Sequence, residues 1–176
     1  SGDFADLAQE DGAYGENDGY VARFDASMNL VWMRGFSGSG HDQVNSVKAT
    51  PDGGMLAVIE TASSDGDMTD LNKGLFDLVV VKYDALGNVV WTRAIGGKNI
   101  ESTDAGIDLL ASGNVILAGY TCSGSGDFEG TDYFGDLFDL FAAELDASTG
   151  EVKWLRTYGG DKSDYLSSVT ATSDGG

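Results

Sequence analysis

Aspartate is the residue type that gives this sequence its clearest chemistry, and its densest cluster is Asp65, Asp67 and Asp70. Their D-x-D-x-x-D spacing could place several carboxylate oxygens around one cation, and Ca²⁺ takes roughly six to eight oxygen ligands. The spacing is not that of an EF-hand, because glycine is absent from the sixth position of the loop. The cluster therefore predicts a calcium site of another kind, with solvated aspartates in Asx-turns as the alternative.

Acids at matching positions of other loops extend this prediction. Asp67 recurs as Asp127, and the acid that ends the same loop, Asp77, recurs as Asp18 and Asp139. Calcium is the one cofactor that the sequence suggests. The candidate ligands are Asp65, Asp67, Asp70, Asp77, Asp127 and Asp139.

Motifs for catalysis are absent from the sequence. The single histidine, His41, and the single cysteine, Cys122, have no recurring partners. There is no Gly-x-Ser-x-Gly elbow, phosphate loop or zinc-ligand spacing. A pair of carboxylates of the glycosidase kind stays open among 29 acids, but acids that recur in every repeat do not supply the unique pair that one active site needs. We therefore expect a chain that is not an enzyme, with a glycoside hydrolase or polysaccharide lyase as the alternative.

Aromatic side chains gather in the loop between residues 121 and 139. Phe128, Tyr133 and Phe134 lie there among carboxylates, a combination that suits recognition of carbohydrate or protein. These three residues are the candidate ligand-binding residues. The alternative is that they hold a long loop on the sheet beneath it.

The elements that must position these residues come from an internal repeat. A Trp-x-Arg phrase occurs three times, at intervals of 59 and 63 residues. Its copies are Trp32 and Arg34, Trp91 and Arg93, and Trp154 and Arg156. Because fixed recurrence is typical of a structural position, we expect tryptophan to fill the space between adjacent repeats and arginine to pair with a recurring acid. Binding of sugars or of an acidic ligand is the alternative.

Each period contains four short apolar or β-branched runs, separated by turn sequences such as Ala-Leu-Gly-Asn and Pro-Asp-Gly-Gly. This pattern predicts an all-β fold of four-stranded antiparallel propeller-type blades, in about three repeats of ~60 residues that are incomplete at both ends. The expected divisions are the end of a preceding repeat at 1–18, repeats at 19–77 and 78–139, and a partial repeat at 140–176. A β-solenoid or sandwich is the alternative.

Four short phrases are the most specific parts of these repeats. They are Lys/Arg-x-Asp at 23–25 and 82–84, Gly-Asn-Val-Val-Trp at 87–91, Gly-Gly at 96–97 and 159–160, and Thr-x-Asp-Gly-Gly at 50–54 and 172–176. In these phrases nearly the whole chain resembles the bacterial SBBP-type β-propeller repeats. The sequence departs from that pattern at Glu144, in the basic position, and at Ala111-Ser112-Gly113. The resemblance implies an extracellular or bacterial cell-surface location and a role in binding or scaffolding.

Charge and composition limit the partners. Acids outnumber bases by 29 to 10, and the net charge of −19 argues against nucleic acid and anionic membrane surfaces. No apolar run approaches the roughly 18–20 residues that span a bilayer. The expected partners are a protein or carbohydrate ligand, and further blades or other copies that close a ring. The functional prediction is a non-enzymatic extracellular surface module for adhesion, scaffolding or ligand display, as a fragment of a longer β-propeller protein.

Overall fold

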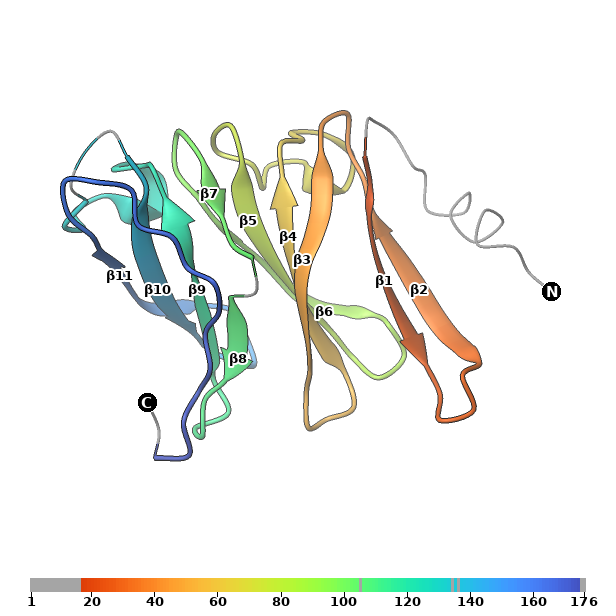
Figure 1. The fold of residues 1–176 in the computed structure, drawn as a ribbon. Coiled ribbons are helices and arrows are strands. Elements are labelled where there is room, and N and C mark those ends of the chain that lie inside the picture. The colour runs from red at the N-terminus through yellow and green to blue at the C-terminus, as the bar shows by residue number, and fades with distance from the viewer. Residues whose placement is uncertain (1–16, 105, 134, 136, 175–176) are drawn as a thin grey trace.

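The computed structural model describes residues 17–174, except 105, 134 and 136. Its strands form three antiparallel sheets that lie side by side in the order of the chain (Figure 1). This confirms the predicted all-β class, with antiparallel sheets of about four strands in roughly repeated units. Within the described residues the sheets do not close into a ring.

The first sheet is the hairpin of β1 (Gly19–Phe24) and β2 (Leu30–Phe36). The second sheet has the order β3 (Asp42–Ala49), β4 (Met55–Thr61), β5 (Asp77–Tyr83) and β6 (Val89–Ile95). In the third, β9 (Val115–Thr121) pairs with the short β7 (Glu101–Ser102) and β8 (Ile107–Leu109), and β10 (Asp139–Leu145) and β11 (Val152–Tyr158) follow. The 3-10 turns η1 (Gly66–Met68) and η2 (Gly126–Phe128) precede β5 and β10.

The sheets are out of phase with the repeats that the sequence suggests. The second sheet takes β3 and β4 from the first sequence repeat and β5 and β6 from the second. Strand β5 is the seam between the two halves, and it pairs with β4 on one side and β6 on the other. Each four-stranded sheet therefore ties two consecutive sequence repeats together.

Strand β5 is buried along its length because a neighbouring sheet covers each of its faces. Val79, Val81 and Tyr83 pack with Trp32 in the cluster between the first and second sheets. On the other face, Leu78 and Val80 join the cluster between the second and third sheets. Such a strand shows a continuous apolar run instead of alternation, because neither face meets water.

The last hairpin of every sheet carries a β-bulge at the same register. The bulges fall between Arg23 and Phe24, Lys82 and Tyr83, and Glu144 and Leu145. A bulge bends its strand and increases the local twist. It thereby sets the angle of the hairpin turn that follows, and in the second and third sheets this turn meets the preceding sheet.

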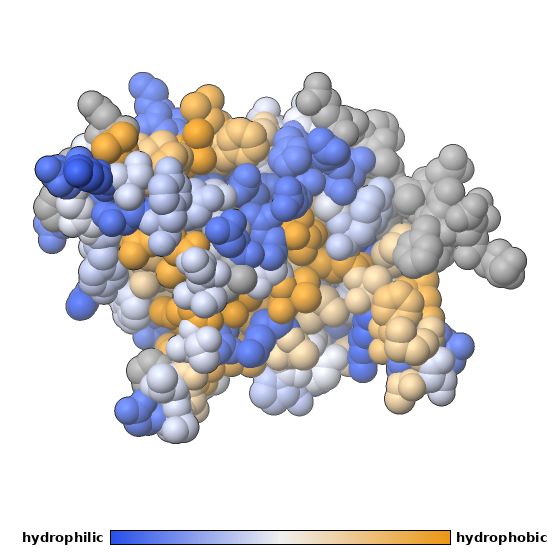
Figure 2. Space-filling model, viewed as in Figure 1, coloured by the Kyte–Doolittle hydropathy of each residue, from blue (hydrophilic) through white to orange (hydrophobic). Residues whose placement is uncertain are grey.

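Apolar side chains gather on the surface of the β1–β2 hairpin, at the lower right of Figure 2. The large exposed side chains there are Tyr20, Phe24, Met28 and Val31. Among the described residues, none of the helical segments has the length and apolar character of a membrane-spanning helix.

Candidate functional site

The Trp-x-Arg phrases lie where one sheet meets the hairpin turn of the next. Trp32 Nε1 donates a hydrogen bond to the carbonyl oxygen of Ala85 at 3.3 Å. Trp91 Nε1 donates to the carbonyl oxygen of Ala147 at 3.0 Å. Both tryptophans are 7% exposed. Each indole therefore joins two successive sheets by burial and by one directed hydrogen bond.

A glycine in each turn makes room for the indole. Gly87 and Gly150 have φ angles of 81° and 71°, a region that favours glycine. A Cβ atom at Gly87 would lie 2.7 Å from the Trp32 ring, and one at Gly150 would lie 2.6 Å from the Trp91 ring. The turn glycine thus serves both the backbone conformation and the contact with tryptophan.

The third phrase differs, because no described residue supplies a following turn. Trp154 is half-buried, and its Nε1 donates to a carboxylate oxygen of Glu144 at 2.6 Å within the same hairpin. The guanidinium of Arg156 lies 5.8 Å from the centre of the Trp154 ring, and Arg156 is exposed. The outer face of β11 is therefore open in the described structure.

The first two arginines make different contacts. Arg34 Nε donates to the carbonyl oxygen of Gly87 at 3.0 Å, so this arginine binds the turn and not an acid, contrary to expectation. Arg93 lies 3.5 Å from a carboxylate oxygen of Asp127, which is a recurring acid. The arginine position of the repeat therefore stabilises the contact between sheets in two ways, by a hydrogen bond to a turn carbonyl at Arg34 and by an ion pair at Arg93.

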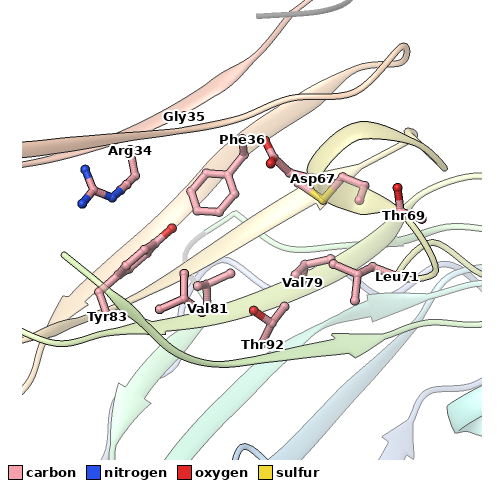
Figure 3. Close-up of a pocket in the computed structure, with 12 residues that line it drawn as sticks. Arg34, Gly35, Phe36, Asp67, Thr69, Leu71, Val79, Val81, Tyr83 and Thr92 are labelled. Carbon is pink, nitrogen blue, oxygen red and sulfur yellow. The ribbon is translucent and has the colours of Figure 1, made fainter. Parts of the chain in front are cut away.

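A cavity of about 370 Å³ lies between β2 and the face of β5 and β6 (Figure 3). Its apolar lining includes Phe36, Val79, Val81 and Tyr83. Arg34 and Asp67 also line it. In the next contact between sheets, Phe128 takes the place of Met68 and is fully buried.

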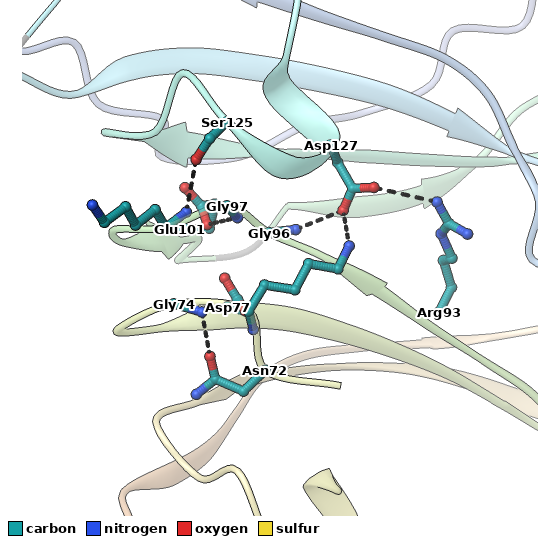
Figure 4. Close-up of polar contacts among 11 residues, drawn as sticks. Asn72, Gly74, Asp77, Arg93, Gly96, Gly97, Glu101, Ser125 and Asp127 are labelled. Carbon is teal, nitrogen blue, oxygen red and sulfur yellow. Dashed lines mark hydrogen bonds and ion pairs between the residues drawn. The ribbon is translucent and has the colours of Figure 1, made fainter. Parts of the chain in front are cut away.

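Asp67 and Asp127 fasten the 3-10 turns η1 and η2 to the preceding sheet. Asp127 accepts hydrogen bonds from Gly96 N at 2.9 Å and Lys73 Nζ at 2.5 Å, and its own N–H donates to Gly96 O at 3.0 Å (Figure 4). Asp67 accepts from Ser37 N at 3.0 Å and Ser37 Oγ at 3.2 Å, and its N–H donates to Ser37 O at 2.9 Å. Both carboxylates therefore act as clamps between sheets.

Other candidate calcium ligands lie apart from one another. The Asp65 carboxylate accepts a hydrogen bond from Ser39 N at 2.7 Å, which lowers the pKa of Asp65. Asp70 is exposed at a φ of 64°, and Asp139 is buried. Within the described ranges, no three His, Cys, Asp or Glu side chains form a group that could hold a metal ion. Calcium binding stays a prediction, and its test is the Tm in EDTA against the Tm in calcium chloride.

Asp77 and Glu101 form a buried pair of carboxyl groups where β5 meets β7; both are 0% exposed. Glu101 accepts a hydrogen bond from Gly97 N at 2.7 Å (Figure 4) and another from Thr121 Oγ1 at 2.6 Å. One oxygen of Asp77 accepts from Lys73 N. With both groups ionised, the other oxygen, Oδ1, is buried without a donor among the described residues.

A proton on this pair resolves the missing hydrogen bond. Burial raises the pKa of Asp77, and burial also raises the pKa of Glu101, to about 7. The two side chains hydrogen-bond to each other, with Glu101 as the protonated partner. Two carboxyl groups in one dry site cannot both ionise at low cost, so the pair holds one proton between them below about pH 7.

Asp18 and Asp42 form the equivalent pair in the preceding contact. Asp42 accepts hydrogen bonds from Thr61 Oγ1 at 2.5 Å and Ser63 Oγ at 2.7 Å. Oδ1 of Asp18 is again buried without a partner among the described residues, and burial together with Asp42 raises the pKa of Asp18. The sequence alone did not lead us to expect a site at Asp42 or Glu101. The available signal was that an acid follows each repeat tryptophan by ten residues.

The predicted aromatic binding site does not form as expected. Phe128 is 0% exposed, and its ring centroid lies 5.3 Å from that of Phe141, so it packs in the core and is not available to a ligand. Tyr133 is half-buried, and its hydroxyl donates to Leu137 O at 3.2 Å. Phe134 lies outside the described residues.

Another aromatic cluster forms from residues that are distant in sequence. The rings of Tyr120, Phe138 and Tyr165 lie 5.2–5.6 Å apart between centroids. Tyr165 is 61% exposed. Since the three residues come from β9, the loop before β10 and the last segment, only the tertiary structure brings them together.

No protein-family model matches this sequence, and no curated protein matches it. The chain is therefore described by its architecture, an all-β fold with three antiparallel sheets.

Replacing Asp127 by alanine is expected to lower the free energy of unfolding by about 1–3 kcal/mol, because the amide of the buried Gly96 loses its hydrogen-bond acceptor. The matched control is Asp65→Ala, in the equivalent turn, whose carboxylate is fully exposed and for which we expect a smaller loss. Urea unfolding measures both variants. Equal losses would contradict the clamp that we assign to Asp127.

Proposed function

We propose that this chain is a non-enzymatic module of the extracellular bacterial surface, built from SBBP-type propeller repeats, that serves adhesion, scaffolding or ligand display. The observation that carries this proposal is the use of the recurring residues. Trp91 and Asp127 both join one sheet to the next, and the recurring acids Asp77 and Glu101 are buried between sheets. Recurrence thus follows the needs of stacking, which is what a scaffold requires.

The buried carboxyl pair does not supply the active site that the glycoside hydrolase alternative needs. A glycosidase needs two carboxyl groups on either side of the glycosidic bond, and its general acid has a raised pKa. Asp77 and Glu101 have raised pKa values, but both are 0% exposed. Neither side chain can therefore touch a glycan in this structure.

The aromatic cluster of Tyr120, Phe138 and Tyr165 is the surface that best suits a displayed ligand contact. Tyrosine rings bind apolar faces and offer a hydroxyl for hydrogen bonding. A net charge of −19 disfavours anionic partners. Neutral or basic glycans and proteins are therefore the expected ligands.

A glycan array and hydrolysis assays on one sample test the proposal. We expect binding without turnover, and we expect Tyr165→Ala to weaken this binding at least about tenfold, as the loss of one stacked ring would. Tyr158→Ala is the matched control, because Tyr158 is 50% exposed but lies outside the cluster. Turnover of any glycan would overturn the proposal, and equal binding by both variants would remove the cluster from it.

A further inference from the structure

The outer face of β11 has the side chains of a sheet-to-sheet contact but no described residue covers it. Trp154 corresponds to Trp91, yet it is only half-buried where Trp91 is 7% exposed. Tyr158 corresponds to Ile95, and their exposed fractions are 50% and 0%. Two hollows of about 410 and 460 Å³ adjoin Tyr158. The face is therefore shaped and composed for a partner.

The two internal contacts show what fits such a face. In each, the tryptophan Nε1–H meets the carbonyl of an alanine in a hairpin turn, and the ring covers the turn glycine. The turn residues are Ala85 and Gly87 in the first contact, and Ala147 and Gly150 in the second. A partner that docks on Trp154 in the same way presents an alanine carbonyl, which takes the place of Glu144 as acceptor for Nε1–H, beside a residue without a side chain.

One described turn of this type, residues 25–29, has no tryptophan against it among the described residues. Its backbone bonds match those of turn 84–88: Asp25 N donates to Asn29 O at 2.9 Å, as Asp84 N does to Asn88 O at 3.0 Å. In both turns the leading carboxylate also accepts from the asparagine N–H, at 2.8 and 2.9 Å. The two turns therefore have the same conformation.

Met28 is the difference between these turns. It stands where Gly87 stands, with a φ of 63° against 81°, and its side chain is 77% exposed. A Cβ at Gly87 already falls 2.7 Å from the Trp32 ring. The longer side chain of Met28 would therefore collide with a tryptophan that docked on this turn in the same way.

We propose that the outer face of β11 is a docking surface for the hairpin turn of a further repeat with glycine at the position of Met28, and that Met28 excludes a second copy of this chain. Head-to-tail contacts between identical copies generate rings when the rotation closes and open filaments when it does not. A single obstructing side chain in the free turn prevents that association while the docking face stays open. This inference does not depend on the proposed function.

The rest of the first sheet is compatible with docking, which makes Met28 the decisive residue. Tyr20 and Phe24 stand at the positions of Val79 and Tyr83, which pack on the preceding sheet in the internal contact. They are 39% and 43% exposed. With glycine in its turn, this hairpin would offer both the apolar face and the alanine carbonyl.

Two variants of the full chain separate the two halves of the contact. Wild type carries the open face with a blocked turn, and Met28→Gly/Trp154→Ala carries an open turn without the docking ring. We expect the mixture to form a one-to-one complex by sedimentation velocity and titration calorimetry. The matched control mixes wild type with Trp154→Ala, whose turn is still blocked, and should bind at least about tenfold more weakly.

Each chain measured alone gives a second readout. Wild type is expected to be monomeric, and Met28→Gly to associate increasingly with concentration, because each copy then carries both halves. Glycine suits this exposed turn with positive φ, so we expect the variant to fold. A second mixture, of wild type with Met28→Gly/Arg156→Glu, repeats the test with a partner that has the open turn but keeps Trp154.

The outcomes separate the two parts of the proposal. Wild type that self-associates as strongly as Met28→Gly would overturn the role of Met28. A mixture that forms no complex, or one as tight as the control mixture, would overturn the docking face.

Discussion

Replacing Trp91 by alanine is expected to lower the free energy of unfolding by about 3–5 kcal/mol, as for other large buried aromatic residues. The Trp91 indole is 7% exposed, lies against Gly150 and donates to Ala147 O at 3.0 Å. Alanine would leave a cavity between the second and third sheets and a carbonyl without its donor. Urea unfolding followed by circular dichroism measures the change.

Trp154→Ala is the matched control for this prediction. The residue has the same place in the repeat, but it is half-buried and no described turn lies against it. We expect the free energy of unfolding to fall by about 1 kcal/mol, because the half-buried Trp154 side chain buries less apolar area than Trp91 does. Similar losses in the two variants would mean that the tryptophan stabilises its own hairpin, and not the contact between sheets.

Stability is expected to decrease between about pH 4.5 and pH 7 because of the buried pair of Asp77 and Glu101. Burial raises the pKa of Glu101 from 4.5 to about 7 in the folded chain. Below pH 4.5 the carboxyl group is protonated in both folded and unfolded chains, so its contribution is complete. Between these values the unfolded chain releases the proton and the folded chain keeps it, which costs on the order of 3 kcal/mol in total.

Comparison with Glu101→Gln isolates this effect from that of other acids. The amide is always neutral and can donate to Asp77 Oδ1, so we expect this variant to exceed wild type in stability at pH 8 and to lose that advantage near pH 4.5. Glu129→Gln, at an exposed position, is the matched control and should follow wild type. Urea unfolding across this range measures the three chains. Parallel profiles for wild type and Glu101→Gln would contradict the shared proton.

The sequence by itself determined the elements and their repetition. Runs such as residues 78–83 are β-branched and apolar, and the turns beside them contain glycine, asparagine and aspartate, so local preferences alone predict strands and hairpins. The spacing of Trp32, Trp91 and Trp154 predicts that the same unit recurs. The structure confirms the all-β class with antiparallel sheets of about four strands.

Only the tertiary structure decided how the units join and what their acids do. Strand β5 pairs with β4 as well as β6, so each full sheet spans two sequence repeats. Asp127 binds the amide of Gly96, Phe128 lies in the core, and Asp77 faces Glu101. Each of these acids lies 24 or more residues from its partner in the sequence. Residue spacing does not encode which side chains meet across a sheet, or the dielectric that surrounds them.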